Sequence, residues 1–412
     1  NNSYFYPSVG LSAILSDMFE MPQAISFAKF RAGYAVVGND TNPYNLAATY
    51  GFGDTFNGFS RVYSPSELKN SNLKPEKTNS IELGADVRFF GNRLGIDLAV
   101  YKSVTKNQII ALPVSNTSGY SSRVINAGEI QNKGLEITLN ATPVHTENFR
   151  WNSTVNFTTS RGTVKELTDG LDFYTIKSNY LTVGAKVGGR IGDLYGTGFK
   201  RVEDANSPYY GEWIIDPDSG LPIVDNTLKK LGNYNPDFMV GFQNSFQYKN
   251  FHFSFLFDWR QGGEFHSRTV AIGGTTGMLD FTVPGRETGI VAEGVIANAD
   301  GSYTENSKSV AASNYYSHVY KRSNEESSMF DATYVKLREV KLGYNLPKKW
   351  FKKVPFNTAT LSIVGRNLAL WTENDHVDPE TISFSGGTVV PGVEDMALPS
   401  TRSFGVNLNL EF

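Results

Sequence analysis

Three aspartates lie within ten residues of one another, at Asp216, Asp218 and Asp225. Carboxylate oxygens are the ligands that calcium prefers, and short acidic loops of this kind bind it. The spacing nevertheless differs from that of an EF-hand loop, and the glutamate that closes such a loop is missing. A solvated turn is therefore the favoured interpretation, and calcium binding by these three side chains is the alternative.

Catalytic chemistry finds little support in the sequence. No G-x-S-x-G segment or phosphate-binding loop is present, and Gly192, Gly196 and Gly198 are typical of ordinary loops. Cysteine is absent, which removes thiolate chemistry and disulfides. The five histidines are scattered without the spacing of metal ligands; they are His145, His252, His266, His318 and His376. We therefore predict that the chain is not an enzyme, has no catalytic residues and needs no cofactor apart from the calcium alternative.

Aromatic residues in long polar segments are candidates for binding. Their planar rings can stack on the apolar faces of sugars, and they can equally pack against a protein surface. We predict that six of them contact a substrate or a lid protein. They are Tyr44, Tyr50, Phe52, Tyr209, Tyr210 and Trp213.

The last segment of the sequence predicts the kind of element that positions these loops. Every second residue there is apolar, and the residues between them are Gly, Asn or Glu. Such alternation is typical of a β-strand with one face in lipid and the other in water. The terminal strand of a soluble β-sandwich is the alternative. We predict that the apolar positions form a barrel-assembly signal; they are Phe404, Val406, Leu408, Leu410 and Phe412.

The same alternation predicts eleven strands along the chain. The expected strands cover about 4–15, 24–37, 77–90, 93–110, 129–143, 149–161, 238–248, 251–259, 331–346, 357–371 and 401–412. Gly91-Asn92 predicts a two-residue hairpin turn. The apolar side of the strand at 331–346 changes parity near Arg338-Glu339, which indicates a β-bulge.

The connections between these strands alternate in length. Short ones begin near residues 16, 91, 144, 249 and 347, and long ones near 38, 111, 163, 263 and 373. The loops 162–237 and 262–330 are the longest, and aromatic residues gather at the short turns. Outer-membrane barrels have short periplasmic turns, long outer loops and interfacial aromatic girdles. We therefore predict an all-β fold, a transmembrane antiparallel β-barrel located in a bacterial outer membrane.

Net charge argues against nucleic-acid binding, and the number of strands indicates that the barrel is incomplete. The net charge is −3 over 412 residues, so no basic surface is expected to bind nucleic acid. Eleven strands is an odd number, whereas bacterial single-chain barrels have an even number. An open sheet in lipid would also leave backbone groups unsatisfied at both edges. We therefore expect residues 1–412 to be the carboxy-terminal part of a larger barrel, paired with strands outside this chain.

Several motifs resemble one known family. They are YFYPSVGLS at 4–12, FRAGYAVVGN at 30–39, LKPEK at 73–77 with Glu82, NAGEIQNKGLE at 126–136, YVKLREV at 334–340, YNLP at 344–347, GRNL at 365–368 with Trp371, and DPE at 378–380. In this order, and across nearly the whole chain, they resemble the SusC/RagA family of TonB-dependent outer-membrane transporters.

The resemblance implies a 22-stranded barrel of Bacteroidota, of which this chain would supply strands 12 to 22. It implies an amino-terminal plug domain and a segment that contacts the TonB complex, both outside this chain. It further implies import of oligosaccharides or peptides beneath a SusD-like lipoprotein lid. A passive outer-membrane porin, or a hydrolase on a smaller barrel, is the alternative function.

Overall fold

The structure is a computed structural model that describes residues 4–41, 45–350, 357–381, 383–385 and 388–411. The chain forms two compact units. The first comprises Asn1–Tyr174 and Ala185–Ile191, and the second Thr175–Gly184 and Gly192–Phe412. Within the described ranges, every helix is too short or too polar to span a membrane.

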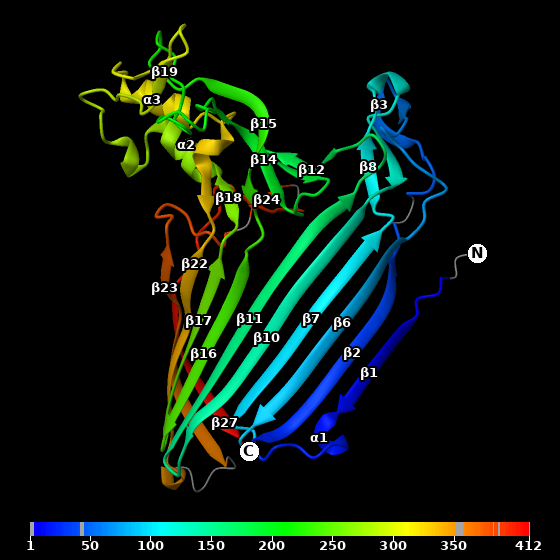
Figure 1. Cartoon of the computed structure of the whole chain (residues 1–412), viewed down its shortest axis with the longest axis vertical. Coiled ribbons are helices and arrows are strands. Elements are labelled where there is room, and N and C mark those ends of the chain that lie inside the picture. The colour runs from blue at the N-terminus through cyan, green and yellow to red at the C-terminus, as the bar shows by residue number, and fades with distance from the viewer. Residues whose placement is uncertain (1–3, 42–44, 351–356, 382, 386–387, 412) are drawn as a thin grey trace. The chain divides into compact units, whose positions relative to one another are not determined.

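The first unit is built on six long antiparallel strands that lie side by side in the order β1-β2-β6-β7-β10-β11 (Figure 1). Phe30, Ala85 and Leu98 lie opposite one another on three neighbouring strands, which confirms one predicted apolar face. The strands are β1 (Ser8–Ile14), β2 (Ile25–Asn39), β6 (Glu76–Phe89), β7 (Leu94–Lys106), β10 (Glu129–His145) and β11 (Phe149–Glu166). Most exceed the ~9–11 residues that a tilted strand needs to cross a bilayer.

The opposite face of this sheet is charged. Arg31 donates hydrogen bonds of 2.9 and 2.7 Å to the two carboxylate oxygens of Asp97, two strands away. The guanidinium reaches across Gly84, where a Cβ atom would lie 2.7 Å from its Nε atom. The predicted separation of an apolar and a polar face is therefore confirmed, and the glycine between the two strands leaves room for the ion pair.

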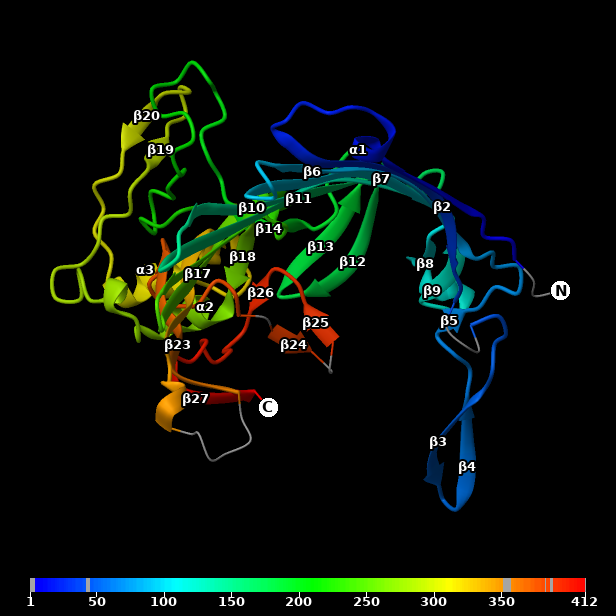
Figure 2. The ribbon, with the colours of Figure 1, turned by 90° about the horizontal axis from the view of Figure 1, so that it is seen from below.

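Smaller elements complete the first unit. A two-stranded hairpin, β3 (Gly51–Phe56) with β4 (Phe59–Tyr63), projects from it (Figure 2). Three short strands form a further sheet in the order β5-β9-β8. Their bounds are β5 (Glu67–Leu68), β8 (Ile109–Pro113) and β9 (Ser122–Asn126), and short helices lie at α1 (Leu15–Met18) and η1 (Asn116–Ser118).

The turn predicted at Gly91-Asn92 is longer than expected. Strand β6 ends at Phe89 and β7 begins at Leu94, so four residues connect them. Phe90, Gly91 and Asn92 all have positive φ angles, of 53°, 65° and 66°. The two-residue prediction was wrong because Phe90 also adopts the left-handed region that bulky side chains rarely occupy. The short connection predicted near residue 249 is confirmed, since Tyr248 pairs with Phe251 and only Lys249 and Asn250 lie between them.

The second unit contains five long antiparallel strands in the order β16-β17-β22-β23-β27. They are β16 (Phe238–Tyr248), β17 (Phe251–Gln261), β22 (Tyr334–Asn345), β23 (Thr358–Thr372) and β27 (Ser403–Glu411). The rings of Phe253, Phe255 and Phe257 contact in sequence, with centroids 6.0 and 5.6 Å apart. With six long strands in the first unit and five here, all eleven predicted strands are confirmed.

The predicted β-bulge is confirmed at Arg338. In the backbone pairing of β22 with β17, Leu337 lies opposite Phe257 and Glu339 lies opposite Leu256. Arg338, between them, therefore has no residue opposite it in the register. Glu339 binds Arg366 on β23, and Arg338 binds Asp258 on β17. The inserted residue therefore lets the adjacent Arg338 and Glu339 both form ion pairs. After it, Val340 and Leu342 pair with Phe255 and Phe253, so the apolar residues stay on the same face of the strand.

The long loops of the second unit fold into a compact layer of their own. A small apolar core contains Leu181, Val183, Leu194, Val390 and Val393. Its strands and helices are β12 (Phe173–Asn179), β13 (Leu181–Lys186), β14 (Asp193–Phe199), β15 (Val224–Asn233), β18 (Glu264–Ser267), α2 (Arg268–Thr276), η2 (Asp280–Thr282), β19 (Val295–Ala297), β20 (Tyr303–Glu305), α3 (Ala312–Val319), η3 (Glu325–Ser328) and β21 (Met329–Asp331). The loop before β27 adds β24 (Ser383–Ser385), β25 (Thr388–Val390) and β26 (Val393–Glu394), and η4 (Lys348–Trp350) lies in a short turn.

The loop between β23 and β27 is tied down by ion pairs. Lys336 is 1% exposed, and its Nζ atom lies 2.8 Å from Asp378 and 2.6 Å from Glu380. Arg338 binds Glu380 and Asp258 at once. Burial acts to raise the pKa of Asp378, but hydrogen bonds from Lys336 and Ser400 hold that pKa below its ordinary value. Both acidic residues of the DPE motif therefore anchor this loop to the long strands.

The final strand supports a test of the assembly signal. Three of the predicted signal residues are exposed on β27, namely Phe404, Val406 and Leu408. A fourth, Leu410, pairs with Ala359 on β23. Phe412 lies outside the described residues. We predict that deleting Phe412, or changing Leu410→Asp, lowers the amount of folded barrel in the outer membrane. An aspartate on the apolar face would interrupt the surface that inserts into lipid. Heat-modifiable mobility in gels measures this amount, Asn409→Asp on the polar face is the matched control, and normal insertion of both variants would contradict the prediction.

Candidate functional site

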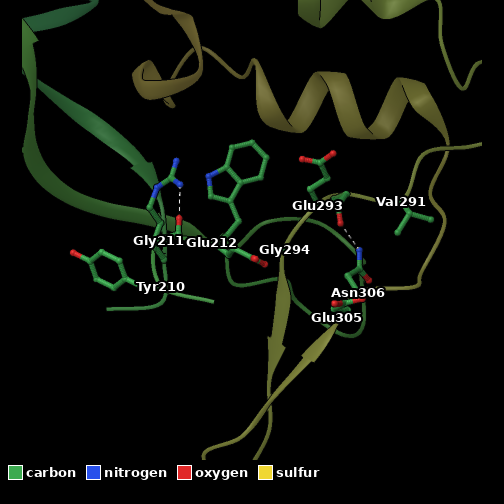
Figure 3. Close-up of a pocket in the computed structure, with 11 residues that line it drawn as sticks. Tyr210, Gly211, Glu212, Val291, Glu293, Gly294, Glu305 and Asn306 are labelled. Atoms are coloured by element: carbon green, nitrogen blue, oxygen red, sulfur yellow. Dashed lines mark hydrogen bonds between the residues drawn. The ribbon is translucent and has the colours of Figure 1, made fainter. Parts of the chain in front are cut away.

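A pocket of about 590 Å³ lies in the loop layer of the second unit (Figure 3). Two stretches of chain line it, one from Arg201 to Trp213 and the other from Val291 to Asn306. The stretches are about eighty residues apart in the sequence, and both belong to long polar loops. The pocket therefore exists only because the two loops fold against each other.

Backbone hydrogen bonds join the two stretches. Val295 donates a 2.8 Å bond to the carbonyl of Trp213 and accepts a 2.7 Å bond from the N–H of Ile215. Gly294 has a φ of 136°, and a Cβ atom there would lie 2.5 Å from the Trp213 carbonyl oxygen. Only glycine allows so close an approach in this conformation. Gly294 and the fully buried Val295 therefore hold the two stretches together beside the pocket.

Trp213 is held by its neighbours and keeps one unused donor. Its ring centroid lies 4.9 Å from that of Phe199, and Arg201 sits over the ring at 5.7 Å. The indole Nε1–H is buried and, within the described part of the chain, has no hydrogen-bond acceptor. A buried indole N–H normally finds a partner.

Arg201 is held in place by Glu326. Its Nη2 atom lies 2.5 Å from the Glu326 carboxylate, and its Nη1 atom donates a 2.7 Å bond to the Gly211 carbonyl. Burial acts to raise the pKa of Glu326, but hydrogen bonds from Lys229 and Arg201 hold it below the ordinary value. The lowered pKa favours the ionised carboxylate, and the charge of Arg201 is paired with that of Glu326.

The mouth of the pocket is acidic. Glu212, Glu293 and Glu305 are exposed, and no cation of the described residues lies within ion-pairing distance of them. Asn306 is bound to the carbonyl of Ala292 at 2.9 Å. Carboxylates around an aromatic ring can accept hydrogen bonds from the hydroxyl or amino groups of a ligand.

The structure brings three of the six predicted aromatic residues together. Tyr210 and Trp213 line the pocket, and Tyr209 contacts Tyr303 on β20 with ring centroids 6.3 Å apart. Tyr50 and Phe52 belong to the first unit, next to and on the β3–β4 hairpin, and are 71% and 79% exposed. Tyr44 lies outside the described residues. Contact of these residues with a substrate or a lid remains a prediction.

The predicted acidic group does not converge on a common point. Asp216 accepts a hydrogen bond from the backbone N–H of Asp218, and Asp225 accepts one from Thr227. These local bonds hold the pKa of both carboxylates below the ordinary value. No group of three metal-binding side chains was found in the described parts of the chain. Asp216 and Asp225 each accept a hydrogen bond within their own turn, and calcium binding by the three side chains stays a prediction.

Sequence reasoning missed the second half of the pocket. Glu293, Glu305 and Asn306 come from a segment with no aromatic cluster, repeat or motif of its own. The one available signal was the glycine at 294 beside the apolar Val295-Ile296 pair, which indicates a buried turn within a polar loop. Nothing in the spacing of residues indicates which other loop this turn contacts.

Long antiparallel strands with one apolar and one charged face define the class of the protein, an outer-membrane β-barrel. The family described as "TonB dependent receptor-like, beta-barrel" matches residues 1–255. The chain therefore belongs to the TonB-dependent receptor β-barrel family, whose members are proteins of the bacterial outer membrane and act as receptors and transporters.

Named relatives agree with this assignment. The chain is 27% identical over 439 residues to TonB-dependent receptor P3 of Formosa agariphila, covering 100% of this chain and 42% of that protein. It is 26% identical to TonB-dependent receptor SusC of Bacteroides thetaiotaomicron, covering 94% of this chain and 38% of SusC. The fold matches the structure of the RagAB peptide transporter with a TM-score of 0.74 and 18% identity, over 99% of this chain and 43% of the other. The chain thus spans about two fifths of the length of the relatives it matches.

Proposed function

We propose that this chain is the carboxy-terminal barrel portion of a TonB-dependent importer of oligosaccharides or peptides. The observation that supports this most is the family match together with a ligand-sized pocket in the loop layer. Pockets of roughly 300–1,000 Å³ are typical of small-molecule sites, and the volume here lies in that range. A plug domain and a TonB-contacting segment belong to the remainder of the transporter.

The edges of the described sheets support a larger barrel. Strand β1 pairs with β2 alone, and β27 pairs with β23 alone, within the described residues. In lipid, each unpaired backbone group costs several kcal/mol. Strands from the rest of the protein would satisfy both edges and close the barrel.

A SusD-like lipoprotein is the proposed partner. The names of two relatives, SusC and the RagAB peptide transporter, suggest a two-component system of this kind. The hairpin formed by β19 and β20 has an exposed tip and carries Tyr303 against Tyr209, next to the pocket. A lid seated there would exclude water from the ligand and strengthen its polar contacts.

The tip of that hairpin allows a test that leaves the core intact. We predict that replacing residues 298–302 with Gly-Gly weakens co-purification of the lid lipoprotein and slows growth on the imported polymer. The tip is exposed and is held mainly by its own turn, in which Asn298 and Ser302 bond at 2.9 Å. Pull-down from outer membranes and growth rate measure the two effects.

Insertion must be unchanged in this variant, which heat-modifiable mobility checks. A strain without TonB separates active import from passive flow. If uptake persists without TonB, and no lipoprotein is recovered with the unaltered protein, the protein is a passive porin and the proposed function is wrong.

A further inference from the structure

A second pocket, of about 540 Å³, lies in the same unit and shares no residue with the first. We name it the Arg322 pocket. It has an apolar side, formed by Tyr180, Tyr195 and two leucines, and a cationic rim. The polar side chains along it are Ser178, Thr182, Thr197, Lys321, Arg322, Ser323 and Glu325.

The cationic rim is built on an ordered series of contacts. Asp395 accepts hydrogen bonds of 2.7 and 2.8 Å from one nitrogen of Arg268. The guanidinium of Arg268 lies 3.6 Å from the centroid of the Tyr180 ring, and that of Arg322 lies 5.0 Å from the same centroid. Cation–π contact with a fixed ring orients an arginine and leaves its N–H groups free to donate.

Tyr180 holds an unusual backbone conformation at the centre of this series. Its φ angle is 69°, in the left-handed region that an aromatic residue seldom occupies. Such strain persists only where the surroundings enforce it, and it gathers at ligand sites. Here the ring is fixed by Arg268 and by packing against the apolar core that contains Leu181.

The two rim cations have no acidic partner. Lys321 and Arg322 are exposed, and no carboxylate among the described residues lies within ion-pairing distance of either. The one carboxylate that lines the pocket belongs to Glu325, and it accepts bonds of 2.8 Å from both the N–H and the hydroxyl of Thr197. Gly196 makes this possible, because a Cβ atom there would lie 2.8 Å from the Cβ of Glu325. The positive charge of the rim is therefore available to a ligand.

We propose that the Arg322 pocket binds a carboxylate group of the imported oligomer. A guanidinium presents a planar pair of N–H groups that matches a carboxylate in two parallel hydrogen bonds. Lys321 adds a second positive charge, and Leu228, which is 48% exposed, offers an apolar surface to the body of the ligand. The inference rests on the proposed import function and adds to it a preference for acidic substrates, whether acidic sugars or acidic peptides.

The test compares acidic and neutral probes on the purified full-length transporter. The sugar pair is an oligomer of galacturonic acid and an uncharged galactose oligomer of equal length. The peptide pair is an aspartate-rich peptide and its asparagine counterpart. We expect one acidic probe to bind more tightly than its neutral partner, and Arg322→Gln to reduce that affinity at least about tenfold, since a charged hydrogen bond is lost.

Lys200→Gln is the matched control, because Lys200 is an exposed cation of the same unit outside the pocket. It should leave all affinities unchanged, and the neutral probes should not distinguish Arg322→Gln from the unaltered protein. Equal affinity of acidic and neutral probes, or no effect of Arg322→Gln, overturns the carboxylate assignment while TonB-dependent uptake still stands. Loss of TonB dependence instead contradicts the import function itself, so the two failures are distinguishable.

Discussion

Replacing Lys336 with methionine should lower the free energy of unfolding of the barrel by about 3–5 kcal/mol. The side chain is almost fully buried, and its ammonium group is bound by Asp378 and Glu380. Methionine has a similar length and cannot carry the charge, so the Asp378 carboxylate, with its side chain 4% exposed, would remain buried without its cation. Urea-induced unfolding in lipid vesicles, followed by tryptophan fluorescence, measures the change.

The pH dependence of this effect has a definite sign. The lowered pKa of Asp378 contributes stability that is present above the ordinary pKa of aspartate, about 4, and is lost as pH falls through the lower folded value. In the Lys336→Met variant burial remains and the cation is gone, so Asp378 takes up a proton at higher pH. The stability difference between the two proteins should therefore narrow as pH is lowered.

Arg366 supplies the matched control for Lys336. Arg366 on β23 pairs at 3.0 Å with Glu339, which is on β22 as Lys336 is, but the two side chains are 65% and 36% exposed. An exposed pair contributes at most about 1 kcal/mol, so Arg366→Gln should have a small effect. Equal losses in the two variants would show that burial does not govern the contribution of these ion pairs.

Placing arginine at Phe255 should destabilise the barrel far more than placing it at Ser254. We expect Phe253, Phe255 and Phe257 to face lipid, where a cationic side chain near mid-membrane costs roughly 2–4 kcal/mol. Phe255 also contacts Phe242 on the neighbouring strand, with ring centroids 6.0 Å apart. The same unfolding measurement compares the two variants.

Ser254 is the internal control because it is adjacent to Phe255 on β17 and faces the other side of the strand. That side carries Asp258, which binds Arg338 and lies with the charged residues. The lumen of a barrel tolerates charge. A larger loss from Ser254→Arg than from Phe255→Arg would mean that the lipid and lumen faces have been exchanged.

The sequence alone determined the long strands of this protein. Alternation of period two is a local property, because successive side chains of an extended backbone point to opposite sides. It therefore located all eleven strands and the bulge at Arg338. It failed at the turn after Phe89, where Phe90 adopts a left-handed conformation that no propensity would suggest.

Tertiary structure alone decided the sites. The first pocket needs Trp213 beside Val295, and the Arg322 pocket needs Tyr180 beside Arg268. The members of each pair are about eighty residues or more apart, with β16 and β17 between them, and loop sequences have no period that indicates which segments meet. The aromatic residues at 209–213 were identifiable because their ring chemistry is a property of the residue itself. Their partners were not, because contact between loops depends on the packing of the whole loop layer around its apolar core.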